Sequence, residues 1–174
     1  DWMEAHLYNA YVVAATLIIY GVLFIALENS SITANPSITK VGHVSTKTAL
    51  FIGLFQLLSL VPGTSRSGST ILGAMVLGCS RGVAAEFSFF LGIPVMFGAS
   101  FLKLVKFFVK GNVLTGPQIF YTILGMAIAF GVSVYSIQFL MGYVRRHDFK
   151  FFGYYRIILG VVVLAYFGIT ALAA

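Results

Sequence analysis

The chain has 174 residues, of which 59% are hydrophobic and only 9% are charged, and its formal net charge is +6. Soluble domains carry about 25% charged residues, so this composition excludes an ordinary soluble globule and predicts an integral membrane protein. The basic residues form no clustered face, which excludes nucleic acid as a partner. The single cysteine, Cys79, excludes an internal disulfide and a CxxC metal site.

Four stretches are long and apolar enough to cross a hydrocarbon core of about 30 Å as helices rising about 1.5 Å per residue. They cover residues 7–27, 84–108, 118–141 and 154–172. None of them alternates apolar and polar residues as the strands of a membrane β-barrel do. The sequence therefore predicts an all-α protein with four transmembrane helices in a single membrane domain.

Residues 46–78 follow a different pattern, with two apolar runs at 49–60 and 71–77 that are each too short to span a membrane. Together they form either one broken span or a re-entrant helix–loop–helix that enters and leaves on the same side. Irregular backbone at membrane depth is tolerated where it is buried in protein or lines a wet cavity.

The basic residues distinguish these two arrangements. If residues 46–78 are re-entrant, seven basic residues fall on one face and three on the other, a bias typical of a cytoplasmic face. The seven are Lys40, Lys47, Arg81, Arg145, Arg146, Lys150 and Arg156, and the three are Lys103, Lys106 and Lys110. If the segment spans the membrane instead, the split becomes five against five. We therefore expect the re-entrant hairpin, with the seven-residue face in the cytoplasm.

The two short runs are joined by VPGTSRSGSTI at residues 61–71, an unusually polar stretch for this chain. Pro62 and Gly63 stop the first short helix and turn the chain. The second short helix begins near residues 67–70, so its N-terminal N–H groups and dipole face the turn. Arg66 adds a planar fork of donors, and hydroxyl donors come from Thr64, Ser65, Ser67, Ser69 and Thr70.

Every one of these groups donates hydrogen bonds, and no carboxylate lies within ten residues on either side of the stretch. The pattern therefore predicts a site for an anion, and a phosphate fits it best. The alternative is that Arg66 extends to the membrane surface while the serines only cap helices. An arginine at mid-membrane costs about 2.5–3.5 kcal/mol on insertion, which favours the functional interpretation.

PGTSRSGSTI, followed by AAEFSFFLGIPVMFGA, closely resembles a signature region of bacterial undecaprenyl-diphosphate phosphatases of the BacA type. The resemblance covers nearly the whole chain. It implies an inverted-repeat membrane fold in the bacterial cytoplasmic membrane, with an active site that opens to the outer face. It also implies hydrolysis of undecaprenyl diphosphate to the monophosphate, which recycles the lipid carrier for peptidoglycan synthesis and confers bacitracin resistance.

The same resemblance assigns roles to residues. Arg66 and Ser65 are the expected catalytic residues, with Arg66 on the diphosphate. The expected substrate-binding residues are Gly63, Thr64, Ser67, Gly68, Thr70, Gln56 and Glu86. For Glu86, a structural role remains an equal alternative, either beside the helix N-terminus or in a pair with Arg81 or Arg66.

A first family signature, E-x-x-x-E with a histidine shortly after it, has no match in this sequence. The chain is therefore expected to be the C-terminal two-thirds of such an enzyme and to be inactive alone. The resemblance implies a divalent metal, magnesium or calcium, with its ligands mainly in the segment that precedes this chain. His43 lies in a loop and cannot be carried over as the family histidine.

A second function remains open, because transporters and lipid flippases also place broken helices around an anionic substrate at the midplane. Both functions use the anion site at residues 62–71, and they differ in whether acid–base groups face it. The expected partners are a polyprenyl diphosphate and membrane lipids, and a homo-oligomer is left open.

Overall fold

The computed structural model describes residues 7–144 and 146–173, and within these ranges the protein consists of helices joined by short loops. In chain order the elements are α2 (Ala10–Glu28), α3 (Ser31–Ala34), the 3-10 turn η1 (Val41–His43), α4 (Thr46–Leu57), the 3-10 turn η2 (Leu58–Leu60), α5 (Arg66–Val76), α6 (Arg81–Val109), α7 (Gly116–Val144) and α8 (Lys150–Ala173). The described part of the chain has no β-strand, only one isolated bridge between Ile38 and Cys79. The predicted all-α fold is confirmed.

Four of these helices, α2, α6, α7 and α8, are long and apolar enough to cross a membrane, as the sequence predicts. The protein is therefore a multi-pass membrane protein. Helix α6 begins at Arg81, three residues before the predicted span, because the Ser80 hydroxyl caps it by accepting a hydrogen bond from the backbone N of Val83. Helix α8 likewise begins before its predicted span, at Lys150.

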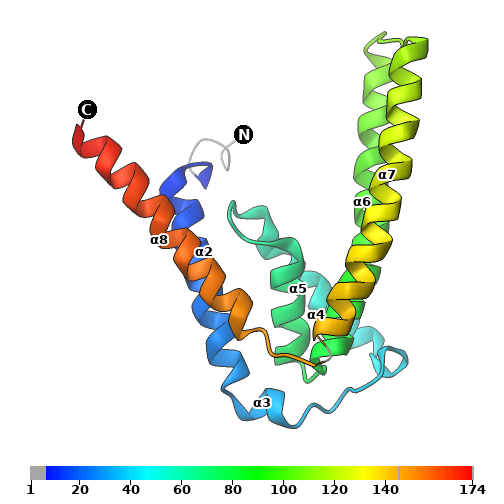
Figure 1. The fold of residues 1–174 in the computed structure, drawn as a ribbon. Coiled ribbons are helices and arrows are strands. Elements are labelled where there is room, and N and C mark those ends of the chain that lie inside the picture. Colours follow the sequence, from blue (N-terminus) through cyan, green and yellow to red (C-terminus); the bar gives the residue numbers. More distant parts are fainter. Residues whose placement is uncertain (1–6, 145, 174) are drawn as a thin grey trace.

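Figure 1 shows α2 packed along α8 on one side, the α6–α7 hairpin on the other, and α4 and α5 between them. The α2–α8 pair has the most extensive contact, and it depends on facing glycines. A Cβ atom added to Gly153 would lie 2.8 Å from the carbonyl oxygen of Gly21, well inside van der Waals contact. Small residues are the usual means by which membrane helices approach this closely.

Helices α4 and α5 form a hairpin whose two ends meet. The backbone N of Ile38, before the hairpin, donates to the carbonyl of Gly78 at 2.9 Å, and the N of Ser80 donates to the carbonyl of Ile38 at 2.8 Å. The pair therefore starts and finishes at one end of the molecule, beside the start of α6 and the end of α7 (Figure 1). Its tip touches α2, where the Thr16 hydroxyl donates to the carbonyl of Pro62 at 2.8 Å.

A buried ion pair holds the helix ends together at the base of this hairpin. The Glu28 carboxylate, at the end of α2, has a fully buried side chain. It accepts hydrogen bonds from Arg81 Nε at 3.0 Å and from the backbone N of Phe149 at 3.0 Å. One carboxylate thus joins α2, the first residue of α6 and the loop that leads into α8.

The apolar core surrounds α5, on which most residues from Gly68 to Met75 are buried. Helix α7 contrasts with it, because Val144 is its only buried residue among those described. The rest of α7 carries large exposed apolar side chains. That distribution fits a helix whose outer surface contacts lipid.

Candidate functional site

The tip of the α4–α5 hairpin has a geometry that only glycine permits. Gly63 adopts φ +83°, in the left-handed region. A Cβ atom at Gly63 would also overlap the Thr16 side chain and lie 2.7 Å from the carbonyl oxygen of Val13. The turn PGT of the predicted anion motif is therefore packed directly against α2.

Ser65 and Ser67 lie at the N-terminus of α5, as the sequence predicts for this motif. The Ser65 hydroxyl caps the helix by accepting from the backbone N of Gly68 at 3.2 Å, and it lies 3.2 Å from the Ser67 hydroxyl. Both serines and Gly68 line a cavity of about 250 Å³. The remaining walls are largely aromatic, from α2, α6 and α8, and no carboxylate is among the lining residues.

Arg156 of α8 completes the polar end of this cavity, and sequence analysis missed it. Its Nη2 donates to the carbonyl of Gly63 at 3.0 Å, and its Nε is buried without a partner among the described residues. The guanidinium carbon lies 5.5 Å from the ring centre of Tyr20, in cation–π range. The sequence analysis counted Arg156 among the seven basic residues of the expected cytoplasmic face. Because Arg156 lies inside α8, that face keeps six basic residues against three on the other face. The sequence did contain a signal for this role, because Arg156 falls inside the predicted span 154–172. An arginine within the membrane is costly and therefore indicates a functional site, as it did for Arg66.

Arg66 is the first residue of α5, but its side chain does not line this cavity. The guanidinium lies instead against Gly92 of α6, and its Nη1 is buried without a partner in the described chain. Gln56 Oε1 on α4 is also buried and has no hydrogen-bond partner among the described residues. Two guanidinium groups with unused donors therefore stand beside one helix N-terminus. An unpaired buried donor costs free energy, and an anion would recover it.

Two further residues of the motif, Thr70 and Thr64, make contacts within the protein. The Thr70 hydroxyl lies 2.6 Å from that of Ser88 on α6 and also donates to carbonyls of its own helix. Thr70 is only 1% exposed, so in this structure it holds α5 to α6 rather than facing a ligand. Thr64 continues the turn, with its backbone N donating to the carbonyl of Val61 at 3.1 Å.

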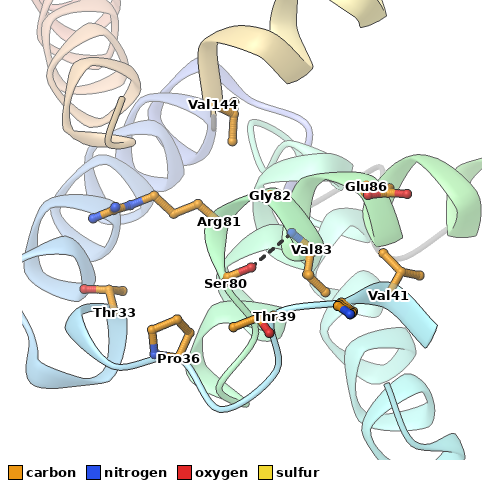
Figure 2. A pocket seen from close by; sticks show the side chains of 11 residues that line it. Thr33, Pro36, Thr39, Val41, Ser80, Arg81, Gly82, Val83, Glu86 and Val144 are labelled. Carbon is orange, nitrogen blue, oxygen red and sulfur yellow. Dashed lines mark hydrogen bonds between the residues drawn. The ribbon is translucent and has the colours of Figure 1, made fainter. Parts of the chain in front are cut away.

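Glu86 lies at a different place from the other predicted site residues. It lines a second cavity, of about 500 Å³, at the base of the hairpin together with Lys40, Ser80 and Arg81. Figure 2 shows Arg81 extending away from Glu86, and the ion pair of Arg81 is with Glu28. The sequence offered no signal for that pair, because 53 residues separate its members.

The family model described as "Bacitracin resistance protein BacA" matches residues 1–162. The chain belongs to this family. A relative named undecaprenyl-diphosphatase from Lactobacillus delbrueckii subsp. bulgaricus is 58% identical over 163 residues, covering 94% of this chain. Relatives of the same name from Streptococcus thermophilus and Limosilactobacillus fermentum are 55% and 56% identical over 95% and 98% of the chain. The chain spans about three fifths of these relatives, namely 59%, 58% and 62% of their lengths.

Within this BacA-family chain, the described residues do not form a metal centre. No group of three histidine, cysteine, aspartate or glutamate side chains that could hold an ion occurs in the ranges 7–144 and 146–173. The cavity at the hairpin tip offers hydroxyls and a guanidinium and no carboxylate, so its hydrogen-bond donors and its one positive charge suit an anion. The lining therefore suits an anion better than a metal ion.

Proposed function

We propose that this protein acts in the hydrolysis of undecaprenyl diphosphate to undecaprenyl phosphate and phosphate, with the hairpin tip as its diphosphate site. The observation that carries the proposal is the pair of half-buried arginines, Arg66 and Arg156, each of which has one buried nitrogen without a partner among the described residues. The relatives' printed name supports the same substrate. A phosphate is the anion that best uses two planar forks and a helix N-terminus at once.

The contribution of these residues is binding and charge stabilisation. In phosphoryl transfer, charge spreads over the equatorial oxygens of the transferred group as the bond to the leaving oxygen breaks. The guanidinium of Arg156 and the hydroxyl of Ser67 are placed to donate to those oxygens from one side of the cavity. Ser65 is held in a fixed orientation by its cap on Gly68, so it is either a further donor or the attacking group. Donors oriented before the reaction are worth most in a site that excludes water.

We further propose that the α4–α5 hairpin is re-entrant, as one half of an inverted-repeat fold in the bacterial cytoplasmic membrane. Both ends of the hairpin lie at the end of the molecule where α6 and α8 begin (Figure 1), and Lys47, Arg81 and Lys150 stand at or next to the first residues of α4, α6 and α8. By the positive-inside rule, basic residues favour a cytoplasmic location for this end. Lys103, Lys106 and Lys110 lie toward the far end of α6. The tip therefore points toward the outer face, from which the substrate enters. Carrier recycling for peptidoglycan synthesis follows from this reaction.

A chimera tests the proposal, with this chain replacing the matching 163 residues of the Lactobacillus relative. Purified in detergent, it is expected to release phosphate from undecaprenyl diphosphate. The Arg66→Lys variant is expected to lose most of the turnover, because lysine keeps a point charge but loses the fork. Equal rates with and without this substitution would remove Arg66 from the site. In proteoliposomes, passage of intact diphosphate lipid across the bilayer without phosphate release would favour the flippase instead.

A further inference from the structure

The contact between α5 and α6 sets which groups of the two helices meet. The Thr70 hydroxyl lies 2.6 Å from the Ser88 hydroxyl, and one turn away on both helices the Arg66 guanidinium lies against Gly92. Residues four apart on a helix share a face. The two helices therefore run antiparallel in a register that stacks Arg66 on Gly92.

The atoms nearest to the space over Gly92 belong to the Arg66 guanidinium group. A Cβ atom built on Gly92 would lie 2.5 Å from Arg66 Nη1, 2.6 Å from Nη2 and 2.9 Å from Cζ, and these are its three nearest neighbours. Carbon–nitrogen contacts are comfortable only at roughly 3.5–4.0 Å. A methyl group at this position and the observed place of the Arg66 guanidinium are mutually exclusive.

The backbone does not require glycine at position 92. Positive φ angles in the described chain occur at Gly63, Gly78 and Gly111, so Gly92 has an ordinary helical conformation. In a helix interior alanine is more favourable than glycine. At Gly153 the glycine admits a neighbouring backbone, whereas at Gly92 it admits a side chain of the motif.

We propose that Gly92 is a positioning residue for Arg66: its missing side chain lets the guanidinium lie flat on α6, beside the N-terminus of α5 where the diphosphate is proposed to bind. The inference rests on the proposed function, because it takes Arg66 as a diphosphate ligand. The guanidinium is the far end of a flexible side chain. A methyl group at position 92 would therefore displace that group and leave the two helices in place.

The test uses the chain in phosphatidylcholine nanodiscs, with farnesyl diphosphate as the probe and calorimetry as the measurement. Gly92→Ala is expected to weaken binding by about tenfold to a hundredfold, the scale on which losing one hydrogen bond to a charged group acts. The matched control is Gly98→Ala, on the same helix, where an added Cβ atom meets nothing within 4 Å. The control is expected to bind as the unsubstituted chain does, and neither variant is expected to unfold at a lower temperature.

A double-mutant cycle distinguishes positioning from a structural role. Gly92→Ala is expected to have no effect on binding or on the thermal midpoint in the Arg66→Ala background, because the group it displaces is gone. Equal binding by Gly92→Ala and Gly98→Ala would overturn the inference, and so would a loss of stability in the Arg66→Ala background. If Arg66→Ala itself binds the probe normally, the proposed role of Arg66 fails and the inference falls with it.

Discussion

Replacing Arg156 should move affinity and stability in different directions. In Arg156→Met the chain loses the donor to the carbonyl of Gly63 and the buried Nε that has no partner. Without ligand, removing a desolvated charge with an unused donor relieves a cost that offsets the lost hydrogen bond. We therefore expect the thermal midpoint of the free protein to be unchanged or higher.

The affinity for a diphosphate should fall in the same variant. A hydrogen bond to a charged group is worth about 1.5–3 kcal/mol, so the loss of the Arg156 fork predicts a dissociation constant roughly 10- to 150-fold larger. The dissociation constant of Arg156→Lys should lie between those of the unsubstituted chain and Arg156→Met, since lysine keeps the charge and loses the planar fork. Calorimetric titration of farnesyl diphosphate into the chain in nanodiscs measures the constants directly.

The matched control is Lys150→Met, which removes a cation from the same helix away from the cavity. Its Nζ lies 3.9 Å from a carboxylate oxygen of Asp148 and it is partly exposed, so it should affect affinity little. Equal losses of affinity in Arg156→Met and Lys150→Met would show that general positive charge, and not the buried fork, attracts the ligand. Unchanged affinity in Arg156→Met would refute the proposed role of Arg156 as a diphosphate ligand.

Three further outcomes are expected. Arg81→Ala should lower the free energy of unfolding by about 3 kcal/mol, near the lower end for a broken buried pair because Arg81 is 38% exposed, as denaturation in mixed micelles would measure. Single cysteines at Ser37 and Gly82, in a background with Cys79 replaced, should be labelled from the same side of the membrane. Labelling of the two new cysteines from opposite sides would contradict the hairpin. As a control, the unsubstituted chain should label slowly, because burial raises the pKa of the Cys79 thiol. This chain alone should bind diphosphate lipid weakly and release no phosphate, with or without magnesium, since no carboxylate lines the tip cavity. Turnover comparable to that of a full-length relative, abolished by Glu86→Gln, would assign the acid–base role to that carboxylate.

The amino-acid sequence by itself determined the features that depend on neighbours along the chain. The four spans follow from apolar runs of sufficient length. The turn at Gly63 and the cap at Ser65 follow from the local preferences of glycine and serine. The donors of Arg66 and its neighbours, with no carboxylate nearby, predicted an anion site before any helix was placed.

Only the tertiary structure decided which distant residues complete that site. Arg156 reaches the carbonyl of Gly63 across 93 residues, and Thr70 meets Ser88 in the register that stacks Arg66 on Gly92. Hydropathy cannot specify such contacts, because helices in a membrane are apolar on most faces and carry no stripe that marks the partner side. Which helix faces meet depends on shape, because small residues let a neighbouring backbone or guanidinium group approach closely. These contacts form only when the helices are packed together.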